Sequence, residues 1–259
     1  VGAFAQLDWA AGPRATVQAA LRYDRYSGFG GSWSPSFSGG AWISPRVRLR
    51  GSVAHAFRIP TYTELYYRDP AHLARADLRP ERGWSADAGL DWAPLPWLVS
   101  VSPFRRSDAD VIDWVKAQPA DLWRTTNVRG VTTTGVEVSV MRRWRGALAR
   151  GFVTAQTVGA PTLALLSKYV LDYTRRSAGL SLAVPLGGAV RGALTADHRR
   201  RQDGQSYTLV GLRVSRRAGP ADIYLDISNA LNARYTEVAG VVMPGRWVTA
   251  GARFDLARQ

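Results

Sequence analysis

Residues 84–92 alternate between apolar and polar side chains, and this alternation constrains the fold more than any other feature of the chain. On a β-strand the apolar members share one face: Trp84, Ala86, Ala88, Leu90 and Trp92. The other face carries Asp87 and Asp91, and it should meet water because two carboxylates are costly in a dry core. The indoles of Trp84 and Trp92 lie roughly 26 Å apart along such a strand, or about 20 Å along the axis of a tilted barrel.

That spacing approaches the height of the apolar band of an outer-membrane barrel, about 25 Å, which has an aromatic girdle at each boundary. A soluble β-sandwich can produce such alternation in one strand, but here the pattern recurs, with Arg or Asp repeatedly on the polar face. Charged side chains from many strands in one interior imply a hydrated lumen. The sequence therefore predicts an all-β protein, a transmembrane antiparallel up-and-down β-barrel. Further alternating segments lie at residues 17–23, 47–53, 210–214, 223–227 and 248–254.

The net charge of +14 comes almost entirely from Arg, since Lys occurs only at positions 116 and 168. These cations are dispersed, and the Lys/Arg-Gly-aromatic signature of RNA-binding strands is missing, so we expect no nucleic-acid partner. The cluster Arg199–Arg201 fits anionic headgroups of outer-membrane lipid and lipopolysaccharide or an anionic ligand, with a solvated loop as the alternative. Because the chain has no Cys, it has no disulfide, thiolate metal site or Cys nucleophile.

Two classes of connector separate the predicted strands: tight turns rich in Gly and Pro, and longer loops. By the architecture of bacterial outer-membrane barrels, the tight turns face the periplasm and the long loops face outside. The long loops are 27–33, 58–81, 116–122, 158–167, 200–204 and 229–245. Thirteen strands are predicted, near residues 1–9, 15–26, 34–43, 47–57, 82–93, 97–115, 123–142, 147–157, 168–184, 189–199, 205–216, 221–228 and 246–256.

The odd number of predicted strands matters because single-chain bacterial barrels normally have an even number. The first segment also begins in the middle of its pattern, with no secretion signal before it. We therefore expect residues 1–259 to be one partial barrel domain, the C-terminal part of a larger barrel.

Four ordered motifs resemble the barrel of TonB-dependent outer-membrane receptors, of the cobalamin and siderophore receptor type. The first is Ala-His-Ala-Phe-Arg-Ile-Pro-Thr-Tyr-Thr-Glu-Leu-Tyr at 54–66, followed by Leu-Arg-Pro-Glu at 78–81. The second runs from Asn127 to Gly-Val-Glu at 135–137. The third is the Asn-Ala-Leu-Asn-Ala-Arg-Tyr segment at 229–235, and the fourth is Pro-Gly-Arg at 244–246.

The resemblance implies the C-terminal ~13 strands of a 22-stranded barrel, integral to the bacterial outer membrane. It also implies TonB-coupled uptake of a scarce nutrient such as a ferric siderophore or cobalamin. The family's plug domain and TonB box are not recognisable in these residues, so coupling to the TonB complex would depend on residues outside them. The family commonly ends on an aromatic residue; here Phe254 or Leu256 would have to serve, before a final Ala-Arg-Gln.

Most of the motif residues fit an architectural role. Pro60 ends a strand because it lacks an amide donor, and the amide of Asn229 suits the cap of the following turn. We expect the motif residues to hold strands and loops in place: Arg58, Pro60, Glu64, Leu65, Pro80, Glu81, Asn127, Gly135, Glu137, Asn229, Tyr235, Pro244, Gly245, Arg246 and Phe254.

Catalysis and cofactor binding find little support. His55, His72 and His198 are scattered without the spacing of a metal site, so we expect no metal, no cofactor and no enzyme. Ser206 near His198 and Asp203 carries almost no geometric information about a triad. The alternatives are a barrel enzyme of the protease or phospholipase type and a passive porin.

The loop 58–81 is the principal candidate for ligand contact. Its tyrosines offer broad, rigid contact surface, and its arginines prefer carboxylate, catecholate or phosphate oxygens. An anionic or partly aromatic chelate therefore suits the loop better than a neutral sugar. The alternative is that these arginines bridge lipopolysaccharide or pair with Glu64 and Glu81. The candidates are Tyr62, Tyr66, Tyr67, Arg68, Arg75 and Arg79.

Overall fold

The computed structural model describes residues 1–160, 165–170, 172–238 and 241–254. Thirteen strands form one antiparallel sheet in the order β1-β2-β3-β4-β6-β7-β10-β11-β13-β14-β15-β16-β19, which confirms the predicted fold class and strand count. They are β1 (Gly2–Ala11), β2 (Ala15–Tyr26), β3 (Gly30–Ser44), β4 (Val47–Arg58), β6 (Glu81–Trp92), β7 (Trp97–Ala109), β10 (Val131–Trp144), β11 (Ala147–Gly159), β13 (Thr174–Gly187), β14 (Val190–Arg201), β15 (Ser206–Ala218), β16 (Ala221–Ser228) and β19 (Trp247–Phe254).

Two smaller sheets and a short helix lie in the loops. A four-stranded sheet has the order β12-β8-β9-β5, and β17 (Thr236–Val238) pairs with β18 (Val241–Val242). The strands of the four-stranded sheet are β5 (His72–Leu73), β8 (Val111–Lys116), β9 (Trp123–Val128) and β12 (Leu166–Ser167). The helix is α1 (Tyr62–Tyr66). None of the helices in the described residues has the length and apolar character needed to span a membrane.

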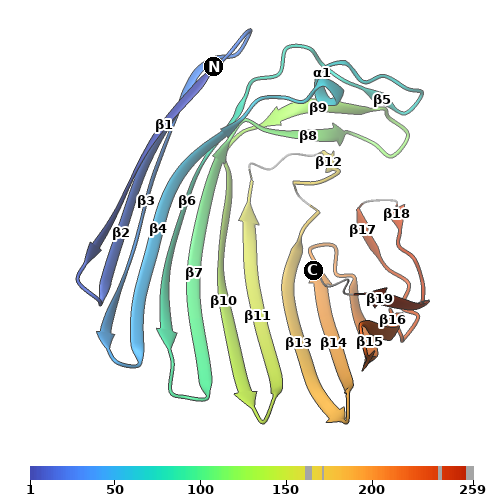
Figure 1. Ribbon diagram of the computed structural model, residues 1–259. Helices are drawn as coiled ribbons and strands as arrows, with labels where there is room; N and C mark the ends of the chain where they lie inside the picture. Colours follow the sequence, from blue (N-terminus) through green and yellow to red (C-terminus); the bar gives the residue numbers. More distant parts are fainter. Residues whose placement is uncertain (161–164, 171, 239–240, 255–259) are drawn as a thin grey trace. The chain divides into compact units, whose positions relative to one another are not determined.

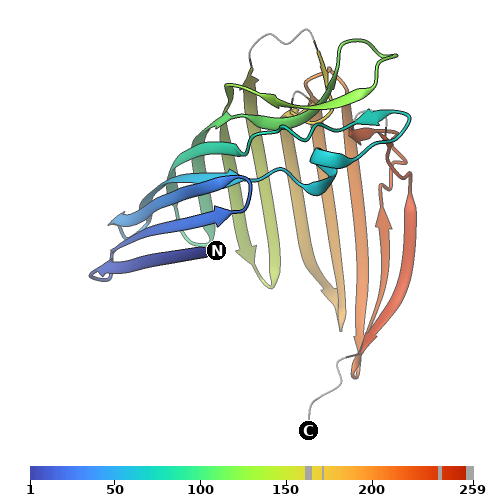
Figure 2. The same ribbon diagram turned by 90° about the horizontal axis from the view of Figure 1, so that it is seen from above.

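The chain divides into two compact units. The first unit comprises Val1–Trp92, Val101–Glu137 and Gln156–Tyr173. The second comprises Ala93–Ser100, Val138–Ala155 and the residues from Thr174 onward. Figure 1 shows α1, β5, β8 and β9 of the first unit together, at the end where β4 stops and β6 starts. In the second unit β13, β14, β15 and β16 run side by side (Figure 2).

Strand register places apolar residues opposite apolar residues on one face of the sheet. In the first unit Leu49 stands opposite Leu90, and in the second unit Leu194 stands opposite Leu212. Leu49, Leu90 and Leu212 are each more than 40% exposed, as expected of side chains that meet lipid and not a protein core.

The opposite face of the same strands is charged, and several of its charges form ion pairs. Arg50 lies 3.6 Å from Asp87 and 3.4 Å from Asp91 and donates a 2.6 Å hydrogen bond to Ser102. Arg213 and Asp226 form the equivalent pair at 3.0 Å in the second unit. The faces therefore separate as the alternation predicted, with ion pairs lining the water side.

Tightly packed apolar side chains are concentrated in the loops of the first unit. Leu65, Leu78 and Ile112 form a buried cluster against which Phe29 packs. Trp114 of β8 and Val128 of β9 are also buried. We call residues 61–80, 110–130 and 165–170 the loop platform.

The platform corrects the predictions for three strands and one loop. The predicted strands 97–115 and 123–142 each break in two, because Asp110 and Gly130 adopt positive φ angles of 57° and 68°. The freed halves, β8 and β9, pair with each other, so the predicted loop 116–122 is only the tip of a hairpin. The predicted strand 168–184 starts instead at Thr174.

Some predictions fall partly outside the described residues. Leu256 and the terminal Ala-Arg-Gln lie there, as do residues 161–164 of the predicted loop 158–167 and residues 239–240 of the loop 229–245.

Candidate ligand-binding site

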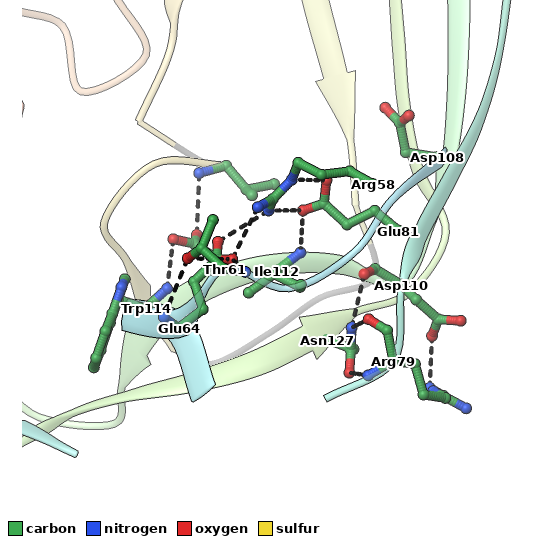
Figure 3. A network of polar contacts seen from close by, with 12 residues as sticks. Arg58, Thr61, Glu64, Arg79, Glu81, Asp108, Asp110, Ile112, Trp114 and Asn127 are labelled. Carbon is green, nitrogen blue, oxygen red and sulfur yellow. Dashed lines mark hydrogen bonds and ion pairs between the residues drawn. The ribbon is translucent and has the colours of Figure 1, made fainter. Parts of the chain in front are cut away.

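A single guanidinium, that of Arg58, joins the platform to the rim of the sheet. It donates to Glu81 from Nε at 2.8 Å and from Nη2 at 2.7 Å, and to Glu64 from Nη1 at 2.8 Å and Nη2 at 2.9 Å (Figure 3). Arg58 and Glu81 are opposite residues in the β4–β6 register, and Glu64 belongs to α1. Bidentate pairs of this kind fix geometry as well as contributing energy.

Each carboxylate in this network also binds the backbone of a neighbouring element. Glu64 accepts from the backbone N–H of Thr61 at 2.7 Å, and the Thr61 hydroxyl accepts from the N–H of Glu64, which makes a capping box. Glu81 accepts from the N–H of Ile112 at 2.6 Å. Burial opposes ionisation of Glu64, but the hydrogen bonds from Arg58 and Thr61 outweigh it and keep the pKa of this carboxyl below its ordinary value. The network therefore links β4, α1, β6 and β8.

The side-chain amide of Asn127 makes a second link. Its Nδ2 donates to the carbonyl oxygens of Arg79 at 2.9 Å and Asp110 at 2.8 Å, and its Oδ1 accepts from the N–H of Arg79 at 2.9 Å (Figure 3). Arg79 in turn donates to Asp110 at 2.5 Å. Asn127 thus fastens β9 to the chain that leads into β6.

Asp113, only 1% exposed, fastens the third segment of the platform. Its carboxylate accepts from the hydroxyl of Ser167 and from the N–H groups of Tyr169 at 3.2 Å and Val170 at 3.0 Å, in addition to that of Trp114 at 2.7 Å. Burial raises the pKa of Asp113, and these hydrogen bonds act in the opposite direction.

On this rigid base the platform presents exposed aromatic rings. Tyr62 and Tyr66 are 80% and 57% exposed, and their ring centroids lie 4.8 Å apart. Tyr67 is turned toward the platform: its hydroxyl donates to Asp69 at 2.9 Å, and its ring lies 5.8 Å from that of His72.

Both lysines of the chain lie on the platform. The Nζ of Lys116 is 4.6 Å and that of Lys168 is 5.8 Å from the ring centroid of Trp123. Lys168 Nζ also lies 3.1 Å from His72 Nε2, and the rings of His72 and Trp114 are 5.1 Å apart. We call Trp114, Lys116, Trp123, Lys168 and His72 the lysine–aromatic cluster. The sequence alone does not reveal this cluster, because its members meet only after β8, β9, β5 and β12 assemble.

The carboxylates and cations of the platform are engaged to different degrees. Asp77 pairs with Arg75 at 2.5 Å, and Asp121 accepts from the N–H of Gln118 at 2.9 Å. Burial opposes ionisation of Asp69, but hydrogen bonds from the backbone of Ala71 and from Tyr67 and His72 lower its pKa to about 2. In the described part of the platform every carboxylate is thus engaged. Four cations there form no ion pair with a carboxylate: Arg68, Lys116, Arg124 and Lys168.

The predicted ligand-side residues therefore separate into two groups. Tyr62, Tyr66 and Arg68 are exposed and available to a ligand. Arg75 and Arg79 are held by aspartates, and Tyr67 by Asp69. The prediction that loop arginines could pair with Glu64 and Glu81 named the right acids, but Arg58 is their partner.

The remaining motif residues lie in or beside the large sheet. Gly135 and Glu137 belong to β10, Phe254 ends β19, and Leu65 is in the buried cluster. Pro60 directly precedes the platform segment 61–80, and Pro80 is the last residue of that segment. In the second unit Asn229 has φ 47° and hydrogen bonds Ala233 in both directions, at 2.8 and 2.9 Å. It also donates to the carbonyl of Pro244 at 3.3 Å. These contacts close the loop before β19.

Other second-unit contacts follow the same pattern. Arg246 donates its N–H to Asn232 Oδ1 at 2.9 Å, and a Cβ atom at position 245 would lie 2.6 Å from that oxygen, so a larger residue there would require the Asn232 side chain to shift. The ring centroids of Tyr235 and Tyr207 lie 4.6 Å apart, and burial raises the pKa of the Tyr235 hydroxyl. His198 hydrogen bonds the hydroxyl of Thr208 at 2.9 Å, and Asp203 accepts from the N–H of Gln205, so neither of these contacts involves Ser206. The described residues contain no group of three or more His, Asp or Glu suited to a metal ion.

Comparison with known proteins identifies relatives along most of the chain. A family model described as TonB dependent receptor-like, beta-barrel, matches residues 1–241. The vitamin B12 transporter BtuB of Vibrio vulnificus is 27% identical over 127 residues, which are 49% of this chain and 20% of that protein.

Solved structures agree on the fold. The siderophore receptor PirA from Acinetobacter baumannii superposes with a TM-score of 0.77 at 16% identity, covering 98% of this chain and 45% of the receptor. The FrpB iron transporter from Neisseria meningitidis superposes with a TM-score of 0.72 at 16% identity, covering 97% of this chain and 44% of the transporter. A ferric enterobactin receptor mutant of Pseudomonas aeruginosa superposes with a TM-score of 0.73, also at 16% identity, covering 95% of this chain and 43% of the receptor. The chain thus spans less than half the length of these relatives.

Proposed function

Because the chain belongs to the TonB-dependent receptor-like β-barrel family, whose members are integral proteins of the outer membrane, we propose that it forms part of a TonB-coupled receptor that imports a scarce, anionic metal chelate. The family consists of transporters without enzymatic activity, which confirms the sequence-based exclusion of catalysis. In this proposal residues 1–259 are one part of the barrel domain, and energy coupling acts on a plug domain of the same receptor.

The charge balance of the platform carries the proposal. Its described carboxylates are all engaged, whereas Arg68, Lys116, Arg124 and Lys168 have no acidic partner among the described residues. Cations of this kind, beside the exposed rings of Tyr62 and Tyr66, suit a ligand with carboxylate or catecholate oxygens. The relatives include receptors for siderophores and a transporter of vitamin B12, and the cationic surface favours a ferric siderophore over cobalamin.

The proposed site is attached firmly to the sheet rim. Arg58, Asn127 and Asp113 each fix one segment of the platform. A preorganised platform loses less entropy when a ligand binds, and this improves affinity without additional contacts.

Uptake measurements test the transport proposal. Cells that produce the receptor containing this chain should accumulate a ferric catecholate siderophore, and the accumulation should stop when TonB is removed. Cyanocobalamin and maltose serve as the neutral comparison ligands. Uptake that continues without TonB would favour a passive porin, and equal uptake of the three compounds would refute the assignment to an anionic chelate.

A further inference from the structure

Two arginines of the second unit face each other on the apolar side of the sheet. Arg176 of β13 stands directly opposite Arg200 of β14. The next pair of opposite residues on the same face of the sheet is Ala178 and His198. Leu180 and Ala196 form the following pair on that face, two residues further along each strand. Both guanidiniums are exposed, and neither forms an ion pair with any carboxylate of the described residues. Like charges directly opposite each other destabilise an antiparallel pair, so an external anion would relieve this arrangement.

An apolar groove of about 420 Å³ adjoins this arginine pair. Val140, Val153 and Leu180 contribute bulky apolar side chains to its lining, and Gly151, Ala178 and Ala196 contribute small ones. His198 and Thr208, which hydrogen bond each other at 2.9 Å, lie at the end nearest the arginines. The volume falls within the range of sites for small ligands, about 300–1,000 Å³.

Strand direction places the arginine pair at the outer leaflet. β13 begins at Thr174 after a long loop, and β13 and β14 meet in a tight turn between Gly187 and Val190. Tight turns of outer-membrane barrels face the periplasm, so the opposite end of these strands faces outside. From Val190 to Arg200 the strand extends roughly 33 Å, enough to cross the apolar band at the usual tilt.

We propose that the groove and the arginine pair form a binding site for the lipid A part of lipopolysaccharide, with an acyl chain in the groove and a phosphate between Arg176 and Arg200. Arg binds phosphate oxygens with two parallel hydrogen bonds, and within the described part of the chain neither Arg176 nor Arg200 is engaged by a carboxylate that would compete with a phosphate. Lipid A carries phosphate and acyl chains on the same sugars, so both groups lie at the depth where the arginines meet the groove. The site is independent of the nutrient ligand proposed above.

Native mass spectrometry of the receptor containing this chain, in detergent, measures the binding of defined lipids. The probes are bisphosphorylated lipid A, its dephosphorylated form and phosphatidylglycerol. Arg176→Gln combined with Arg200→Gln removes the charge, and Ala196→Phe fills the groove. Arg216→Gln is the matched control, because Arg216 of the neighbouring strand β15 is exposed and stands opposite Val190, at the other end of β14 from Arg200. Heat-dependent gel mobility verifies that each variant is folded.

The double arginine variant should bind bisphosphorylated lipid A roughly tenfold or more weakly, as should Ala196→Phe, while Arg216→Gln keeps wild-type affinity. Wild-type receptor should prefer bisphosphorylated over dephosphorylated lipid A. Unchanged affinity in a folded double variant would overturn the placement of the phosphate between the arginines. Unchanged affinity in a folded Ala196→Phe variant would overturn the placement of the acyl chain in the groove. Equally tight binding of phosphatidylglycerol would overturn the choice of lipid A.

Discussion

Replacing Arg58 by Ala should loosen the loop platform while leaving the membrane-spanning sheet folded. The change removes four hydrogen bonds to two carboxylates, Glu64 and Glu81, whose side chains are only 16% and 17% exposed. A hydrogen bond to a charged group contributes about 1.5–3 kcal/mol. Because Arg58 itself is 42% exposed, solvent screening limits the loss for the whole network to about 2 kcal/mol.

Hydrogen exchange resolves this loss by position. About 2 kcal/mol corresponds to a roughly 30-fold faster exchange of amides that open with the platform, such as those of Leu65 and Ile112. Amides of β4 and β6 in the membrane should exchange as in wild type. Arg75→Ala is the control, since its exposed pair with Asp77 should contribute at most about 0.5 kcal/mol. Wild-type protection of Leu65 and Ile112 in Arg58→Ala would show that the network does not hold the platform.

Three further perturbations probe the faces and the loops. Arg introduced at Ala88 or Leu212 should lower the free energy of unfolding by about 2–4 kcal/mol near the bilayer midplane, whereas Ser85→Arg on the charged face should have a small effect. Refolding titrations in lipid measure both, and an equal loss on the two faces would contradict the face assignment. Since the pKa of Glu64 is lowered in the folded protein, its contribution is present above the unfolded value of about 4.5 and is lost as the pH falls through the folded value. Amide protection of α1 should therefore be constant from about pH 7 to 5 and decline below about 4.5; a decline already at pH 6 would exclude Glu64 as its cause. Asp113→Asn should release residues 167–170 at a cost of about 2 kcal/mol, because an amide nitrogen cannot accept the hydrogen bonds that the carboxylate accepts; limited proteolysis at wild-type rates would contradict this.

The sheet could be predicted from the sequence because its physical constraint is local. Alternation with period two decides which face of residues 84–92 meets lipid, and Gly and Pro mark the turns. The thirteen strands that the sequence predicts are therefore matched in number by the thirteen strands of the large sheet. The platform depends on contacts between distant residues. Arg58 meets Glu81 only because β4 and β6 pair in one register, and Asp113 meets Ser167 across 54 residues.

Some of the missed features did carry a local signal. Thr61 and Glu64 have the spacing of a capping box, which identifies the start of α1. The break at Asp110 was harder to see, since a positive φ is tolerated by Asp but is not demanded by it. The pairing of Arg75 with Asp77 was open to prediction, because their i and i+2 positions place both side chains on one side of an extended segment.

The affinity of a ferric catecholate siderophore for the receptor containing this chain tests the proposed ligand site most directly. Tyr62, Tyr66 and Arg68 are changed together to Ala, and Arg75→Ala provides the matched control. The triple variant should bind at least roughly tenfold more weakly, a loss of about 1.4 kcal/mol, while the control retains wild-type affinity. Unchanged affinity in a folded triple variant would mean that these three side chains do not contact the ligand and that their place on the platform is purely structural.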